Sequence, residues 1–371
     1  MKRLAVIAAL ALVGCGGHSD RYTRKAAQKS LLKLETPGLV IGEFRVTKIT
    51  DGDTIRVDGL DSSLRLLGVD TEETFKSEGD RRAFEGGWPQ YMAMKRGNSP
   101  RPVKFATPLG EDAKHFAEKF FSGSDKVRLE RDHPAEIRDR YQRYLAYVFV
   151  NRNGTWVNYN IEAVRAGMGP YFPKYGQSRR FHKEFVEAQE EARKAKRGIW
   201  ADGVMAYPDY DERLAWWNAR GDFVAQFRTE GEGKANYVDI THWDATKQLE
   251  DLVGKEVNVL GTVGDVRIGE KGPTRVTLSR QQFSDFPLVF FDRDVFVQSN
   301  IAEQKGEFVW ITGVPTIYEN PHNHKKVVQI VIDRASQVRV SQVPPGKPPA
   351  PAKPPGPAPT PPAIPTSSNT R

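Results

Sequence analysis

The sequence predicts an α+β protein made of a small five-stranded Greek-key barrel with packed helices, a second β-barrel domain and a disordered proline-rich tail. Three observations lead to this prediction. Strand-like segments alternate with turn residues near the start of residues 41–202, and helical patterns end that region. Five more strand-like segments lie within residues 237–342, and prolines dominate from residue 343 onward. At 371 residues with 39% hydrophobic content, the chain is long and apolar enough for two cores.

The first domain is predicted from strand and helix patterns in a fixed order. Alternating residues predict strands over 44–49, 54–57, 64–69, 127–130 and 144–150, with turns at Asp51-Gly52 and Asn153-Gly154. Helical spacing predicts helices over 109–121, 157–167 and 178–196, the last ending at Gly198. This order favours an OB-like Greek-key barrel over residues 41–202.

A connector over residues 203–236, with a helix at 211–220, leads to the second domain. Its strands are expected at 256–266, 274–279, 287–291, 308–318 and 327–332, with a helix at 295–304. Five strands with a helix between the third and fourth form the OB-fold arrangement. Alternation places Phe290 and Phe291 on opposite faces, and Phe308 and Trp310 on one face within the core. The domain either binds single-stranded nucleic acid, or packs on the first domain or another protein.

The N-terminus has the order of an export signal. A basic start at Lys2 and Arg3 precedes an apolar run over residues 4–13, too short for a permanent membrane span. The following Leu-Val-Gly-Cys resembles a bacterial lipobox and implies lipidation of Cys15, the only cysteine. We therefore expect a lipoprotein signal peptide over residues 1–15, a spacer over 16–40, and an exported, membrane-anchored protein. Gly16 after the cysteine favours the outer membrane, if the cell has one.

The charge and the cysteine count limit the possible functions. A formal net charge of +8 favours polyanionic partners: nucleic acid, acidic polysaccharide or an anionic membrane surface. A single cysteine excludes an intrachain disulfide framework and a zinc site built on several thiolates. We expect no small-molecule cofactor, because no glycine-rich phosphate loop or similar motif is present. The proline-rich tail over residues 343–371 is compatible with a protein or cell-wall partner.

Three segments carry the residue types that phosphodiester hydrolysis needs. They are Asp51-Gly52-Asp53-Thr54, the stretch from Arg65 to Thr74, and Asp139-Arg140-Tyr141-Gln142-Arg143. Close carboxylates and a backbone carbonyl can hold calcium, a further carboxylate can activate water, and arginine forks fit phosphate oxygens. The combination therefore points to metal-assisted phosphodiester hydrolysis.

These segments in this order, closed by Gly198-Ile199-Trp200, resemble the staphylococcal nuclease (thermonuclease) family over residues 41–200. The resemblance implies a calcium-dependent enzyme that cleaves DNA and RNA with little sequence preference and leaves 3′-phosphate ends. It implies calcium ligands at Asp53, Asp70 and the main-chain carbonyl of Thr71, and a general base, or water-orienting group, at Glu73. It also implies phosphate binding by Arg65 and Arg143 and a neighbouring phosphate contact by Tyr141.

The sequence departs from the family pattern at three places. Glu72 replaces a common proline; it can bind the ion, raise the proton affinity of Glu73 or face water, and we expect the last. Gln142 replaces a common glycine and is strained if its φ is positive. The long segment 75–108 either gathers the nucleic acid backbone electrostatically or is an unordered insertion.

Other residues have a structural and a functional interpretation. We expect His322 and His324 to form a polar turn rather than a metal site, and Trp216 and Trp217 to pack in a core or domain interface rather than stack on bases. Two functional alternatives are a non-catalytic nucleic-acid-binding or scaffold lipoprotein that uses the second barrel, and a surface adhesin for acidic glycans. The complete set of catalytic residue types argues against a pure binding protein.

Overall fold

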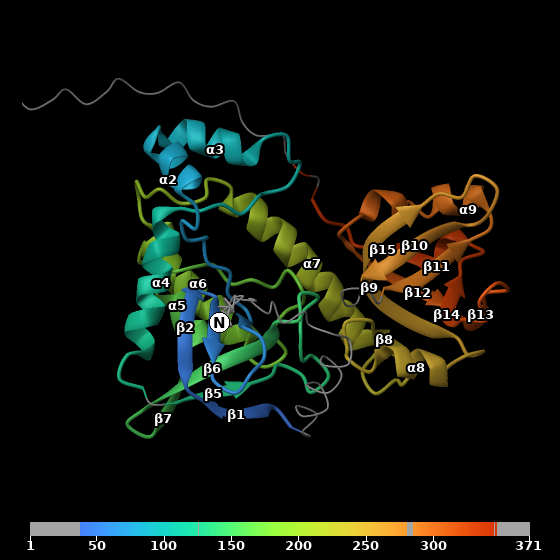
Figure 1. Ribbon diagram of the computed structural model, residues 1–371, viewed down its shortest axis with the longest axis horizontal. Coiled ribbons are helices and arrows are strands. Elements are labelled where there is room, and N and C mark those ends of the chain that lie inside the picture. The colour runs from blue at the N-terminus through green and yellow to red at the C-terminus, as the bar shows by residue number, and fades with distance from the viewer. Residues whose placement is uncertain (1–37, 125, 280–284, 345, 347–371) are drawn as a thin grey trace, which may run out of the picture. The chain divides into compact units, whose positions relative to one another are not determined.

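The computed structural model describes residues 38–124, 126–279, 285–344 and 346 (Figure 1). It confirms the α+β class: two sheets account for the strands, and helices cover parts of both. Cys15, the signal peptide and most of the expected spacer and tail lie outside the described residues. Within the described residues, no helix is both long enough and apolar enough to span a membrane.

The first sheet has the strand order β1-β5-β6-β4-β3-β2, with β7 paired to β6. Its strands are β1 (Val40–Phe44), β2 (Val46–Asp51), β3 (Thr54–Val57), β4 (Leu64–Leu66), β5 (Val127–Glu130), β6 (Tyr144–Arg152) and β7 (Thr155–Asn158). All pairs are antiparallel except β4 with β6, which places the end of β4 beside the start of β6. The segment expected as one strand over 44–49 is divided, because β1 pairs with β5 and β2 pairs with β3.

Three helices pack against this sheet: α4 (Pro108–Phe121), α5 (Tyr159–Arg165) and α6 (His182–Lys194). The Thr107 side chain caps α4, and Pro108 occupies its first turn, where a missing N–H costs nothing. The helix expected over 157–167 begins two residues later, because Val157 pairs with Val150 in β7. The start of α6 is also later than expected, since the backbone N–H groups of Arg179 and Arg180 donate to Asp132.

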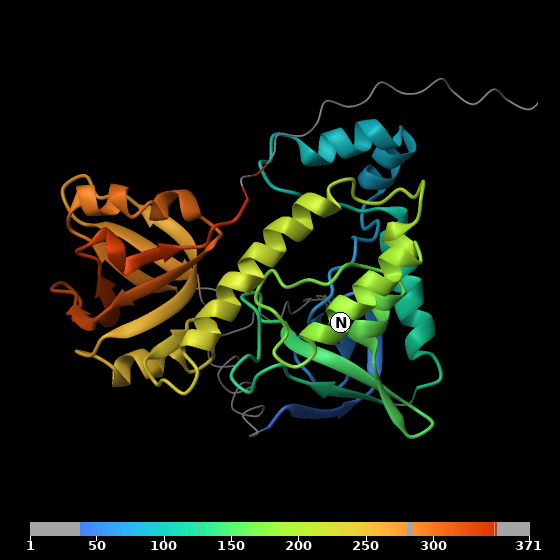
Figure 2. The same ribbon diagram turned by 180° about the vertical axis from the view of Figure 1, so that it is seen from behind.

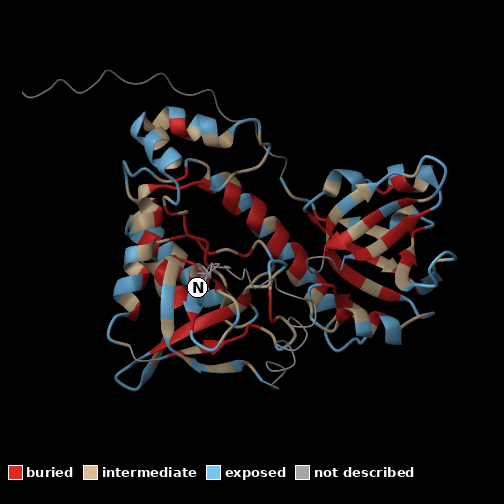
Figure 3. Cartoon of the chain, in the orientation of Figure 1, coloured by how far each residue is buried: buried red, intermediate tan, exposed pale blue. Residues whose placement is uncertain are grey.

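The long segment after Glu73 is ordered, so of the two alternatives left open for it, the unordered insertion was wrong. It forms α2 (Glu78–Glu85) and α3 (Trp88–Arg96) around an aromatic cluster. Ring contacts link Phe75, Phe84, Trp88, Tyr91 and Phe105. Figure 3 shows the exposed outer surface of these two helices.

The connector helix α7 (Tyr210–Glu230) is ten residues longer at its C-terminus than expected, and Figure 2 shows it along its length. Trp216 and Trp217 are buried, at 8% and 3% exposure, which confirms the packing interpretation. The second half of α7 packs Phe223, Val224 and Phe227 against Leu260, Phe308 and Trp310. These contacts with residues of the second sheet accompany a helix that runs beyond the range that its sequence pattern suggested.

The second sheet has the order β13-β14-β11-β10-β9-β12-β15, with β8 paired to β9. Its strands are β8 (Tyr237–Asp239), β9 (Val257–Arg267), β10 (Thr274–Ser279), β11 (Phe286–Phe290), β12 (Phe308–Gly313), β13 (Pro315–Glu319), β14 (Lys326–Val331) and β15 (Val338–Val340). Its helices are α8 (Ala245–Asp251) and α9 (Arg293–Gln298), and a 3-10 turn follows at Ile301–Gln304. The strand expected over 308–318 is two strands, because β12 pairs with β9 and β13 pairs with β14.

Side-chain burial in the second sheet-rich region follows the predicted alternation. Phe290 is buried at 1% exposure whereas Phe291 is 70% exposed, and Phe308 and Trp310 are both buried. His324 lies in the turn between β13 and β14, where it hydrogen-bonds Glu319 at 2.9 Å and has a φ of +53°. The polar-turn interpretation of this segment is confirmed.

Candidate active site

The carboxylates of the predicted site come from two turns of the first barrel. Asp51 ends β2 and Asp53 directly precedes β3, whereas Asp70 and Thr71 follow β4. All four residues are at most 5% exposed. The Thr71 N–H donates to Asp53 Oδ2 at 3.1 Å, so the two turns are in direct contact.

The chain reaches Asp70 through a tight turn at Gly68. Its φ is +72°, and a Cβ at this position would lie 2.4 Å from the Phe185 ring. Glycine is therefore required by both the backbone conformation and the close approach of α6.

Arg65 lies in the middle of β4 and forms ion pairs with both Asp53 and Asp70. Burial acts to raise the pKa of Asp53, but the positive charges of Arg65 and Lys104 outweigh it and hold that pKa below its ordinary value. Asp53 is therefore a carboxylate at neutral pH, as a calcium ligand must be.

Glu73 is held at the edge of the same group by its backbone. Its carbonyl accepts a hydrogen bond from the Thr107 N–H at 3.0 Å. Its carboxylate lies 2.8 Å from Lys76 Nζ and 3.1 Å from Lys104 Nζ. Burial acts to raise the pKa of Glu73, but Lys104 and Lys76 together lower it, so Glu73 is ionised and can accept a proton.

Glu72 does not face water, and that expectation was wrong. Its side chain is fully buried and accepts hydrogen bonds from Thr107 Oγ1, the Tyr207 N–H and the Tyr210 hydroxyl. The Glu72 side chain points toward the connector. The three donors replace the hydrogen bonds that water would otherwise make to this carboxylate.

Arg143 and Tyr141 come from the loop that precedes β6. Arg143 Nε donates to Asp139 Oδ2 at 2.8 Å, and the Arg143 guanidinium lies 5.7 Å from the centre of the Tyr141 ring. Gln142 between them has a φ of +66°. The strain expected for a non-glycine residue here is confirmed, and Asp139 nevertheless fixes the position of Arg143.

These groups line one cleft of about 410 Å³. Of the predicted site residues, the lining includes Asp53, Arg65, Asp70, Glu73, Tyr141 and Arg143. Thr71 lies beside the cleft through its contact with Asp53, and Cys15 lies outside the described residues. Residues from the insertion and from α7 complete the wall: Pro102, Lys104, Arg213, Trp216 and Trp217.

The donor set at this cleft fits a calcium ion. Asp53 and Asp70 offer buried carboxylate oxygens that meet at one cation, Arg65. The hydroxyl of Thr71 is buried and has no hydrogen-bond partner among the described residues. An all-oxygen set of two carboxylates and nearby neutral oxygens matches the preference of calcium.

Several cationic residues at the cleft were not anticipated from the sequence. Lys76 lies 3.0 Å from Asp51, and Lys104 lies 3.0 Å from Asp70. Lys174 Nζ lies 4.2 Å from the centre of the Trp216 ring, and burial, followed by Arg220, lowers the pKa of Lys174 to about 8. No local sequence pattern distinguishes these lysines from surface lysines, because Asp51, Asp70 and Trp216 are distant from them in the chain.

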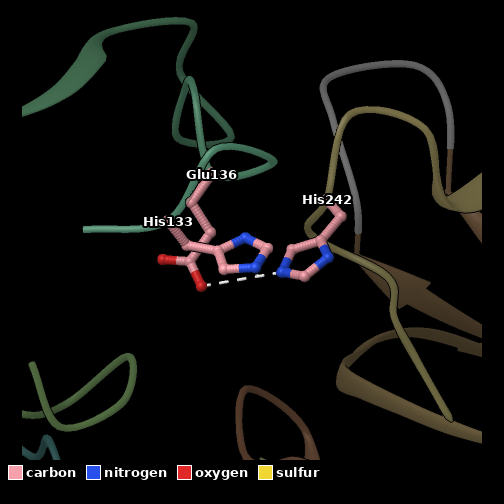
Figure 4. Close-up of side chains that lie close together, drawn as sticks. All are labelled: His133, Glu136 and His242. Atoms are coloured by element: carbon pink, nitrogen blue, oxygen red, sulfur yellow. Dashed lines mark ion pairs between the residues drawn. The ribbon is translucent and has the colours of Figure 1, made fainter. Parts of the chain in front are cut away.

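A second polar cluster joins His133 and Glu136 to His242, away from the cleft lining (Figure 4). The two imidazole rings stack with centres 4.8 Å apart, and His242 Nε2 lies 3.6 Å from Glu136 Oε1. The same carboxylate oxygen accepts a hydrogen bond from Arg228 at 2.8 Å. Because a guanidinium already neutralises Glu136 and the stacked rings do not converge on a point, we interpret the cluster as an ion-pair network rather than a metal centre.

Comparison with known proteins gives consistent results for the first domain. Residues 63–202 match the family model described as staphylococcal nuclease homologue. An uncharacterized protein of Methanocaldococcus jannaschii is 32% identical over 158 residues, which cover 42% of this chain and 70% of the relative. The thermonuclease of Staphylococcus hyicus is 30% identical, over 43% of this chain and 76% of the relative. A prophage-derived endonuclease of Bacillus subtilis is 29% identical, over 43% of this chain and 44% of the relative.

Proposed function

Because this chain belongs to the staphylococcal nuclease family, we propose that it is a calcium-dependent nuclease that hydrolyses DNA and RNA outside the cytoplasm with little regard for sequence. The nuclease activity rests on the family. The observation that carries the specific proposal is the convergence of Asp53, Asp70 and Glu73 with Arg65 on one cleft.

Asp53, Asp70 and the main-chain carbonyl of Thr71 would hold the calcium ion. Bound there, the ion supplies positive charge beside the scissile phosphate. The remaining steps belong to the side chains of the cleft.

Glu73 orients a water molecule and takes its proton as the water oxygen forms a bond to phosphorus. The bond from phosphorus to the 5′-oxygen breaks, that oxygen gains a proton, and the products are a 3′-phosphate and a 5′-hydroxyl. Arg65 and Arg143 bind the non-bridging oxygens and stabilise the charge that develops on them. Tyr141 contacts a neighbouring phosphate, a role supported by its 71% exposure and its position in the cleft lining.

The proposed location depends on the N-terminal segment. The basic start, the apolar run over 4–13 and the Leu-Val-Gly-Cys motif support export and lipidation at Cys15. Acyl chains on Cys15 would anchor the protein to a membrane. Mass spectrometry of the mature N-terminus tests this: a lipidated cysteine as first residue is expected, and an intact Met1 would contradict it.

The nuclease proposal is tested with the full-length chain, purified in mild detergent, on single-stranded DNA and on RNA. We expect cleavage with calcium, none with chelator, and a fall in rate of at least about 100-fold in Glu73→Gln. Glu78→Gln, an exposed carboxylate at the start of α2, is the matched control and should cleave like the wild type. Binding of nucleic acid without cleavage would instead favour a scaffold protein.

A further inference from the structure

Lys104 places an ammonium group among the carboxylates of the proposed calcium site. Its Nζ lies 3.0 Å from Asp70 Oδ1, 3.1 Å from Glu73 Oε1 and 3.8 Å from Asp53 Oδ2. The first and third of these residues are the proposed calcium ligands, and the second is the proposed base. The ammonium group and a calcium ion compete for the same carboxylate oxygens, so both cannot stay bound to them.

The backbone on both sides of Lys104 is fixed. The Phe105 N–H donates to the Tyr207 hydroxyl at 3.0 Å, and the Phe105 carbonyl accepts from the same hydroxyl at 2.7 Å. The Ala106 carbonyl accepts from the Tyr91 hydroxyl at 3.0 Å. The Val103 carbonyl accepts from Arg213 at 2.5 Å. Lys104 is therefore tethered beside the acidic group by contacts to the insertion and to the connector.

The side chain of Lys104 is more exposed than the carboxylates it contacts. It is 37% exposed and lines the cleft, whereas the Asp53 and Asp70 side chains are 5% exposed. A flexible four-carbon stem lets the ammonium leave the carboxylates while its backbone stays in place. Once displaced, the ammonium remains in the cleft where a substrate phosphate would approach.

We propose that Lys104 is a tethered counter-cation that competes with calcium for Asp53 and Asp70 and thereby weakens the calcium affinity of the resting protein. This inference rests on the proposed calcium site. Calcium binding requires the ammonium to move away, so the lysine raises the calcium concentration at which the site fills. The insertion and the connector together set that threshold, because they hold the backbone of residues 103–106.

Lys76 provides a matched control within the same cleft. It carries the same charge and pairs with Asp51 and Glu73, but it has no ion pair with Asp53 or Asp70 among the described residues. Removing the charge of Lys76 alters the general electrostatic field of the cleft. It leaves the ion pairs of the proposed calcium ligands Asp53 and Asp70 unchanged. Comparison of the two lysines thus separates direct competition from a general effect of charge.

The test is calorimetric titration of calcium into the full-length, metal-free protein without nucleic acid. Lys104→Met should bind calcium about tenfold more tightly or better than the wild type, and Lys76→Met should show a clearly smaller gain. Lys104→Arg, which keeps the charge, should stay near the wild type. Circular dichroism checks that each variant folds, and Lys104→Gln replaces the methionine variant if that one does not.

Unchanged or weaker calcium binding in folded Lys104→Met would overturn the inference while leaving the proposed function intact. An equal gain in Lys76→Met would also overturn it, because the effect would then be one of general charge. Absence of calcium binding in the wild type and in every variant would instead contradict the calcium site itself.

Discussion

The carboxylate of Glu72 accepts a hydrogen bond from the hydroxyl of Tyr210 at 2.7 Å, across 138 positions of the chain. Tyr210 is the first residue of α7, and Glu72 directly precedes the proposed base Glu73. The same oxygen accepts the Tyr207 N–H at 2.7 Å. The connector is therefore joined to the active site through the one carboxylate that the sequence suggested was facing water.

The burial of Glu72 predicts a pH-dependent stability. Burial raises the pKa of Glu72 above its ordinary value of 4.5. Between pH 4.5, the pKa in the unfolded chain, and the higher pKa in the folded chain, the folded chain holds a proton that the unfolded chain releases. The free energy of unfolding therefore falls as pH rises through this window. Glu72→Gln keeps an uncharged acceptor and should show a smaller fall in melting temperature. Thermal melts over a pH series check this, with Glu78→Gln, which is exposed, expected to follow the wild type.

His242 predicts a second pH effect in a higher window. Burial acts to lower the pKa of His242, but Glu136 and Asp239 raise it above the ordinary value of 6.5. The nearby cation Arg179 opposes protonation of His242 less strongly than these carboxylates favour it. Its stabilising contribution is thus complete below pH 6.5 and is lost as pH rises through the folded pKa.

A His242→Gln variant should therefore lose more stability at pH below 6.5 than at clearly alkaline pH. Urea denaturation at the two pH values measures the difference. His322→Gln, in the exposed turn between β13 and β14, is the control. Equal losses at both pH values for His242→Gln would contradict the protonated interaction with Glu136.

The positive φ of Gln142 predicts a stabilising substitution. A left-handed conformation at φ +66° is unfavourable for a residue with a Cβ, and glycine removes that cost but gains entropy in the unfolded chain. Gln142→Gly should be about 0.5–1 kcal/mol more stable in urea denaturation. Asn153→Gly, at φ +52°, should gain less, because asparagine tolerates this conformation better. A loss of stability in Gln142→Gly would show that its side chain makes compensating contacts.

Arg143 should contribute through the geometry of its fork as well as through its charge. Arg143→Lys keeps the positive charge but loses the planar guanidinium with its paired donors. In the wild type, the Nε of this guanidinium donates to Asp139. We expect kcat to fall about 100-fold on single-stranded DNA. Arg140→Lys, three residues earlier and bonded to Ser279 at 3.3 Å, should retain near wild-type kcat. A similar kcat for Arg143→Lys and the wild type would remove Arg143 from transition-state binding.

Much of the first domain and its carboxylates could be predicted from local sequence. Asp53 and Asp70 each lie in a turn that follows a short strand, and the alternation of residues in the strand predicts where the turn begins. The two carboxylates come close together because β3 and β4 are neighbours in the sheet. The strain at Gln142 was also predictable, since it depends on the backbone of one residue. The boundaries of α5 and α7 were less accurate, because pairing of Val157 and packing beside Phe308 decide where those helices start and end.

The sequence by itself determined the α+β class, the nuclease family and the turns that carry Asp53, Asp70 and Glu73. These features depend on residue type and on spacing within a few positions of each other. Only the tertiary structure decided that Glu72 is buried against Tyr210, and that Lys104 lies among the carboxylates. The reason is physical: the partners of both residues come from distant parts of the chain, and their burial and charge pairing exist only after the insertion and the connector have packed around the cleft.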